Sequence, residues 1–112
     1  MSMTDRELLE LAAKAAGMAP PYDEHGIFSA WVGDPVHGHW WNPIEYDGDA
    51  LRLAADLCIN IEWFPGMKFV QTCRFGIGEI IGWVDERGRS GSLRRAITVA
   101  AARIGKAVQE QH

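Results

Sequence analysis

The chain has 112 residues, of which 47% are hydrophobic and 23% are charged. These values are ordinary for a soluble globular protein, and the length suits one domain that folds without a metal or a disulfide. The formal net charge is −4 and the sequence isoelectric point is near 5.5, which disfavours a general DNA-binding protein.

Charge and apolar character vary along the chain in ways that limit its class. Residues 1–66 hold eleven acidic and three basic residues, a balance of −8, whereas residues 67–112 hold four acidic and eight basic residues, a balance of +4. This asymmetry indicates either two faces for different partners or two halves that each solvate their own helices. The apolar stretches are too short to cross a membrane, and acidic residues stand where a signal peptide has its basic start, so we expect a cytoplasmic protein.

Residues 5–16 are predicted to form the first helix. Thr4 and Glu7 have the spacing of a capping box, and leucine and alanine recur at helical intervals up to Gly17. A proline-rich segment follows, and then the alternation of residues 27–32 predicts a short strand.

A second helix is predicted over residues 48–58. Asp47 or Asp49 can accept hydrogen bonds from the free amides of its first turn and complement its dipole. Three strands are then predicted as an antiparallel meander, at residues 59–64, 68–75 and 78–84.

The last helix carries the clearest apolar stripe of the chain. We expect Ser92 to cap it, and residues 85–92 to form a polar, glycine-rich loop before it. Gly105 lies inside this helix, where glycine costs about 1 kcal/mol relative to alanine. Its presence indicates close packing against a neighbouring element or an early end of the helix.

Together these elements predict an α+β fold. The order αβαβββα indicates a single-domain α/β sandwich over residues 1–112, with an antiparallel sheet of three to four strands and at least the first and last helices covering its apolar surface. Cys58 and Cys73 lack the spacing of a metal or redox motif, so we expect them to be small buried hydrophobic residues.

Three segments carry a resemblance to a known group of proteins. "TDRELLELAAKAAG", "WNPIEYDGDALRLAADLCI" and "RRAITVAAARIG" together resemble small uncharacterised proteins of proteobacterial phages and prophages, and they cover about 45 residues. The group is similar in layout to the phage ABA sandwich domain, in which a sheet lies between helices. The resemblance implies a mobile-element origin and an α/β sandwich, and it implies no catalytic residues.

Histidines near the middle of the first half are the best metal candidates. His25, His37 and His39, with Asp34 nearby, have side chains that zinc and similar ions prefer. A closed site needs four ligands with supporting partners, and the domain needs no metal to fold. A solvated loop that contains histidines is therefore the favoured interpretation, with metal binding as the alternative.

Basic residues around the start of the last helix suggest an anion site. Arg87, Arg89, Arg94 and Arg95 flank glycines that expose backbone amides, and a helix N-terminus favours a phosphate. The segment lacks the spacing of a nucleotide-binding loop, so an ordinary charged loop is favoured over a phosphate or nucleic-acid contact.

A catalytic site is not apparent in the sequence. Ser90 or Ser92 could be combined with His37 and Asp34, but no nucleophile-elbow pattern is present. We therefore expect a protein that is not an enzyme and that has no cofactor.

Five tryptophans remain to be explained. Trp31, Trp63 and Trp83 fall in strand patterns, whereas Trp40 and Trp41 are adjacent and point to opposite sides if the chain is extended there. One of these two should pack under the second helix and the other should stay on the surface, as interface anchors often do.

These observations favour a non-enzymatic phage or prophage accessory protein. We expect it to bind a host protein, a phage protein or a second copy of itself, through a sheet face or through Trp40, Trp41 and Trp31. The alternative is a nucleic-acid or phosphate-binding protein that uses the arginines of residues 87–95. Nucleic acid is the disfavoured partner, and no membrane partner is expected.

Overall fold

The computed structural model describes residues 3–18, 31–32 and 36–110, with the backbone alone described at 31–32. Its helices are α1 (Asp5–Ala15), α2 (Asp47–Leu57) and α3 (Arg89–Glu110), and short 3-10 turns occur at η1 (Pro65–Met67) and η2 (Glu86–Gly88). Its strands are β1 (Trp31–Val32), β2 (His39–Trp40), β3 (Asn60–Phe64), β4 (Phe69–Arg74) and β5 (Ile77–Gly82). The predicted α+β class and the order αβαβββα are confirmed, with β2 as an additional two-residue strand.

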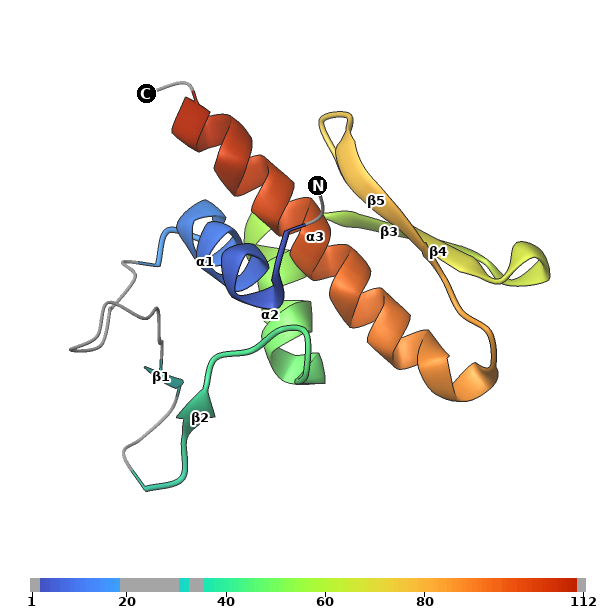
Figure 1. The fold of residues 1–112 in the computed structure, drawn as a ribbon, viewed down its shortest axis with the longest axis horizontal. Coiled ribbons are helices and arrows are strands. Elements are labelled where there is room, and N and C mark those ends of the chain that lie inside the picture. Colours follow the sequence, from blue (N-terminus) through green and yellow to red (C-terminus); the bar gives the residue numbers. More distant parts are fainter. Residues whose placement is uncertain (1–2, 19–30, 33–35, 111–112) are drawn as a thin grey trace.

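The helices gather on one side of the main sheet, which has the antiparallel order β3-β4-β5. The long helix α3 crosses one face of this sheet, and α1 and α2 pack on the side of α3 that is turned away from the strands (Figure 1). The first helix was expected on the sheet, but its main contacts are with α3. The layers therefore run sheet, α3, then α1 with α2, and among the described residues no helix covers the opposite face of the sheet.

The packing of α1 on α3 is unusually close because small residues meet there. Ala12 and Ala13 of α1 are fully buried against Ala100 and Ala101 of α3. Farther along α3, a Cβ atom added at Gly105 would overlap the carbonyl oxygen of Leu11. The close packing predicted from Gly105 is thus confirmed. Within the described residues, no helix has the length and apolar character to cross a membrane.

A two-residue turn joins β4 to β5. Phe75 and Gly76 have φ angles of 52° and 77°, and Arg74 pairs with Ile77 across the turn. Positive φ at both central residues is typical of a type I′ turn, which prefers Asn-Gly. Phe75 is therefore in a strained backbone conformation, and its side chain is 84% exposed. The guanidinium of Arg74 lies 4.2 Å from the centroid of its ring.

Two helix starts differ from the predictions. Asp85 accepts hydrogen bonds from the amides of Arg87 and Gly88, which shapes η2. Helix α3 begins at Arg89 and includes residues 89–92, the second half of the segment predicted as a loop. Ser92 is inside that helix, and its hydroxyl donates to the carbonyl oxygen of Gly82 at 3.0 Å instead of capping. The N-cap of α2 is Tyr46, whose side chain makes no capping hydrogen bond.

The cysteines also differ from expectation. Cys58 is exposed at the C-terminal end of α2, where its φ of 53° ends the helix in a left-handed conformation. Cys73 is only partly buried, on the face of the sheet turned away from α3. Both thiols are free.

Candidate protein-interaction site

The adjacent tryptophans before α2 have opposite environments. Trp41 is 8% exposed and belongs to the core that α1, α2 and α3 share, whereas Trp40 is 60% exposed on β2. The backbone of Trp40 pairs with that of Trp31 in the small β1–β2 sheet. The prediction of one buried and one exposed tryptophan is confirmed, and Trp40 is the one that faces solvent.

A buried carboxylate holds the segment that carries this tryptophan pair. Asp49 is 2% exposed, and its Oδ2 accepts a hydrogen bond from the amide of Asn42 at 3.0 Å. The same oxygen lies 2.9 Å from Nε2 of His39, whose ring centroid is 4.7 Å from that of Tyr46. Asp49 was expected to accept from amides at the start of α2, but it binds the preceding turn instead.

The metal and catalytic candidates do not converge within the described residues. His25 and Asp34 lie outside them, His37 is exposed in a turn, and His39 is engaged with Asp49. In the described ranges, no group of three histidine, cysteine or acidic side chains is placed to hold a metal. Ser92 donates to Gly82, as described above, and Ser90 is exposed at the start of α3.

A groove that two tryptophans line lies at one end of the sheet. It has a volume of about 730 Å³ and lies between η1 and the start of α3. Trp63 of β3 and Trp83, which follows β5, meet in it edge to face, with ring centroids 5.7 Å apart. Trp63 is 41% exposed, so its ring forms part of the outer surface.

Sheet geometry explains why these two rings meet. Trp63 pairs with Val70 and Val70 pairs with Ile81, so these three side chains share the face toward α3. Trp83 comes two residues after Ile81 and continues on that face. Large side chains from the two outer strands therefore reach each other across β4.

Charged side chains of both signs surround the groove. Lys68, Asp85, Glu86 and Arg89 line it together with the tryptophans. Arg89 lies 3.4 Å from Glu86, and its guanidinium is 5.7 Å from the Trp83 ring centroid. An apolar centre with a charged rim is the usual composition of a protein interface.

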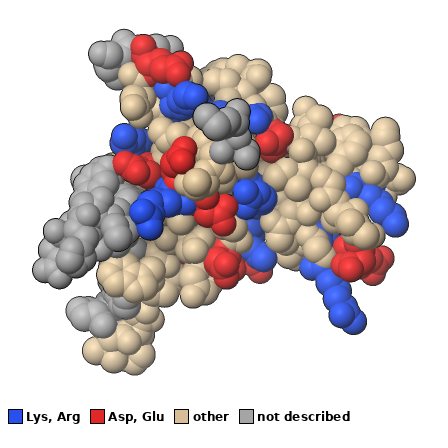
Figure 2. Space-filling view, in the orientation of Figure 1, with Lys and Arg blue, Asp and Glu red and all other residues tan. Residues whose placement is uncertain are grey.

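The arginines of residues 87–95 do not form a single cluster. Arg94 donates to the carbonyl of Ile44 at 2.8 Å and to Asp47 at 2.6 Å, while Arg95 reaches Asp5 at 3.1 Å. Arg89 belongs to the tryptophan groove, and Arg87 is exposed. On the face shown in Figure 2, acidic and basic side chains are interspersed over the helices and do not separate into one basic patch.

The groove was missed in the sequence because its two tryptophans are twenty residues apart in separate strands. Trp63 and Trp83 were assigned to the sheet, which is correct for Trp63, but their meeting depends on the register of three strands. The alternation of side chains between the two faces of each strand could have predicted that these rings meet. In a meander with turns at 65–68 and 75–76, Trp63 and Trp83 fall on the same face.

The comparisons add no relative for this chain. No family model, curated protein or solved structure matches it.

Proposed function

We propose that this protein is a non-catalytic accessory protein that binds another protein through the groove between Trp63 and Trp83. The observation that carries the proposal is the meeting of two tryptophans in an open groove whose rim is charged. Tryptophan and arginine are the residues most enriched at the energetic centre of interfaces, and Arg89 lies beside Trp83. We also propose a phage or prophage origin, from the resemblance of the three sequence segments, and a cytoplasmic location, from the composition of the chain.

Trp40 offers a second surface for the same function. It is 60% exposed on β2 and is held in place by the Asp49 contacts of the neighbouring turn. This surface and the groove lie on separate elements, so single substitutions distinguish them.

Affinity capture from lysate of the source organism tests the proposal. We expect Trp83→Ala to lose at least tenfold of the captured partner, because removing an interface anchor costs about 2 kcal/mol or more. Trp40→Ala tests the second surface, and Phe75→Ala, which removes an exposed ring outside both surfaces, is the control. Capture that is unchanged in Trp83→Ala and lost in Trp40→Ala would move the interface to β2, and capture unchanged in both would contradict the proposal. Unfolding temperatures of both variants show whether they are folded.

A further inference from the structure

The two edges of the main sheet differ in whether their backbone groups are already bonded. The amide of Trp83 donates to the carbonyl of Lys68 at 3.0 Å, which sets the alternation of hydrogen-bonded pairs between β4 and β5. Gly78, Ile80 and Gly82 therefore point their backbone groups away from β4.

Side chains engage three of the six outward backbone groups of β5. Arg103 of α3 donates to the carbonyl of Gly78 at 2.5 Å, and Ser92 of α3 donates to that of Gly82 at 3.0 Å. The amide of Ile80 donates to the carboxylate of Glu79 at 2.9 Å. These contacts disfavour a further strand at this edge.

The edge of β3 is open. The same alternation directs the backbone groups of Phe69, Gln71 and Cys73 toward β3, and these residues pair with Phe64, Glu62 and Asn60. Ile61 and Trp63 then point their amides and carbonyls outward. No hydrogen bond from the described part of the chain reaches those four groups, which have the spacing that an added strand requires.

Two hollows lie on the side of the sheet that faces α3, and each has one side chain of β3 in its lining. One, of about 230 Å³, is lined by Ile61 together with Leu51 of α2 and Leu93 of α3. The other is the groove at Trp63. Residues two apart on a strand are separated by about 6.8 Å and point to the same face. An added strand would therefore place its side chains opposite Ile61 and Trp63 on the face that carries the two hollows.

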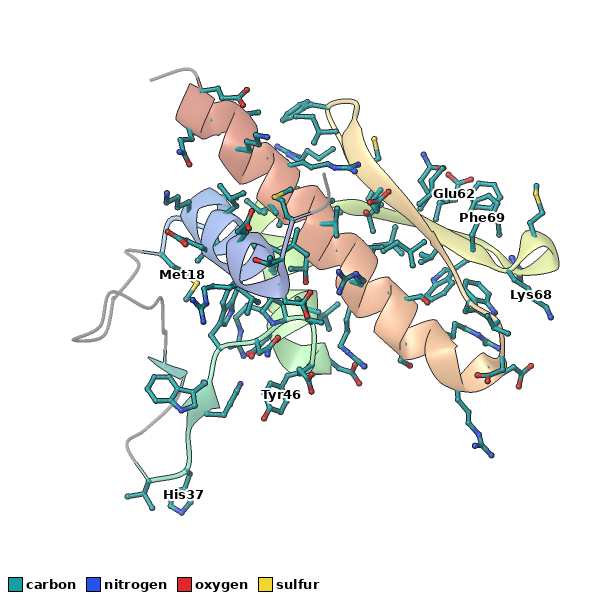
Figure 3. All side chains as sticks on the ribbon, in the orientation of Figure 1. Met18, His37, Tyr46, Glu62, Lys68 and Phe69 are labelled. Atoms are coloured by element: carbon teal, nitrogen blue, oxygen red, sulfur yellow. The ribbon has the colours of Figure 1, made fainter. Side chains whose placement is uncertain are left out.

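The opposite face supplies a charge for recognition. Glu62 and Phe69 lie on the side of the sheet turned away from α3 (Figure 3). Glu62 is exposed, and within the described residues it makes no ion pair. Opposite charges across neighbouring strands stabilise a sheet, so Glu62 favours lysine or arginine opposite it.

The same glutamate disfavours a second copy of the chain as the occupant. In the antiparallel register that pairs Ile61 with Trp63 of another copy, Glu62 would stand directly opposite its own counterpart. Like charges directly opposite are destabilising.

We propose that the β3 edge binds an extended segment of a partner protein as an added strand, with apolar side chains opposite Ile61 and Trp63 and a lysine or arginine opposite Glu62. Main-chain hydrogen bonds would supply affinity and the two hollows specificity, as in other strand-addition complexes. This inference rests on the proposed function, because it uses the same tryptophan groove, and it names the mode of binding and the partner's chemistry.

Selection from a display library of random nine-residue peptides on the full chain tests the inference. We expect the enriched peptides to share the alternation apolar, basic, apolar. N-methylation of the peptide amides that face β3 should weaken binding at least tenfold, whereas N-methylation of the intervening amide should not. Glu62→Lys should shift the selected central residue from basic to acidic, and Glu62→Gln should remove the preference without loss of the fold.

The contrary outcomes are distinct from failure of the proposed function. Absence of an enriched alternating motif, indifference to N-methylation, or backbone amide shifts confined to β4 and β5 in NMR spectra would overturn strand addition. A dimer in sedimentation that Glu62→Gln strengthens, because the repulsion between the two facing glutamates is removed, would assign the edge to a second copy and would also overturn it. If one of these results is obtained but capture from lysate still depends on Trp83, the proposed function stands. If the peptides bind as expected but capture from lysate does not depend on Trp83, only the proposed function is contradicted.

Discussion

Asp49 and His39 join α2 to β2 through a contact of 2.9 Å between a carboxylate oxygen and an imidazole nitrogen. The carboxylate is 2% exposed, while the imidazole side chain is 38% exposed, so the contact lies at the boundary of the core. Because the same oxygen also accepts the amide of Asn42, one buried group fixes both the strand and the turn before α2. The position of the neighbouring Trp40 on the surface depends on it.

Replacing Asp49 with alanine should destabilise the domain by about 2 kcal/mol, because the amide of Asn42 would lose its partner in a partly buried site. Urea unfolding measures this change. Asp56→Ala is the control, since Asp56 is an exposed carboxylate of the same helix, and its effect should stay within about 0.5 kcal/mol. Equal losses in the two variants would contradict the structural role of Asp49.

Gly105→Ala should destabilise the protein although alanine is the better helix former. The usual gain of about 1 kcal/mol is outweighed here, because the new methyl group would overlap the Leu11 carbonyl and push α1 from α3. We expect a net loss of about 1–3 kcal/mol in thermal or urea unfolding.

Gly91→Ala is the matched control in the same helix. A Cβ atom there would lie 3.6 Å from a side-chain nitrogen of Arg94, which is an ordinary contact. We expect it to gain up to about 1 kcal/mol. A gain at both glycines would show that α1 and α3 are not held as closely as described.

Phe75→Asn should stabilise the β4–β5 hairpin by about 0.5–1 kcal/mol. Asparagine tolerates a φ of 52° better than phenylalanine does, and it would create the Asn-Gly sequence that type I′ turns prefer. The change also removes the ring beneath Arg74, a contact worth about 0.5–1 kcal/mol at exposed sites. Loss of stability in urea unfolding would show that this contact outweighs the backbone strain.

Thr72→Val should cost about 1 kcal/mol, because the buried hydroxyl of Thr72 ties β4 to α3 by donating to the carbonyl of Ala96 at 2.8 Å. Thr98 is equally buried, but its hydroxyl donates within α3, to the carbonyl of Arg94. Such back-bonding adds little to helix stability, so Thr98→Val should be nearly neutral. Comparison of the two unfolding midpoints separates a bond between layers from a bond within one helix.

Periodicity predicted the elements of this fold well where side-chain burial alone determines them. The apolar stripe of α3 was correct, and α2 and β4 were predicted within one residue of their observed bounds, since each of these elements has one buried face. The start of α3 was wrong because the local preference of Arg89, Ser90 and Gly91 for a loop is overridden by tertiary contacts, such as that of Ser92 with Gly82.

The candidate site was less accessible to sequence reasoning than the fold. The alternation rule correctly required one of Trp40 and Trp41 to be exposed, but the choice between them depends on the core that buries Trp41. The groove of Trp63 and Trp83 needs the register of β3, β4 and β5, and no local pattern specifies it. Long-range pairing is what the sequence left undetermined.

Engagement of the β5 edge by Arg103 and Ser92 has a consequence for assembly. A sheet with two open edges can add copies of itself without limit, which is how edge strands lead to fibrils. Here the contacts of Arg103 and Ser92 disfavour addition at β5, so an association of copies through their β3 edges would end with two molecules. The contacts of α3 with β5 thus limit the growth of assemblies by strand pairing.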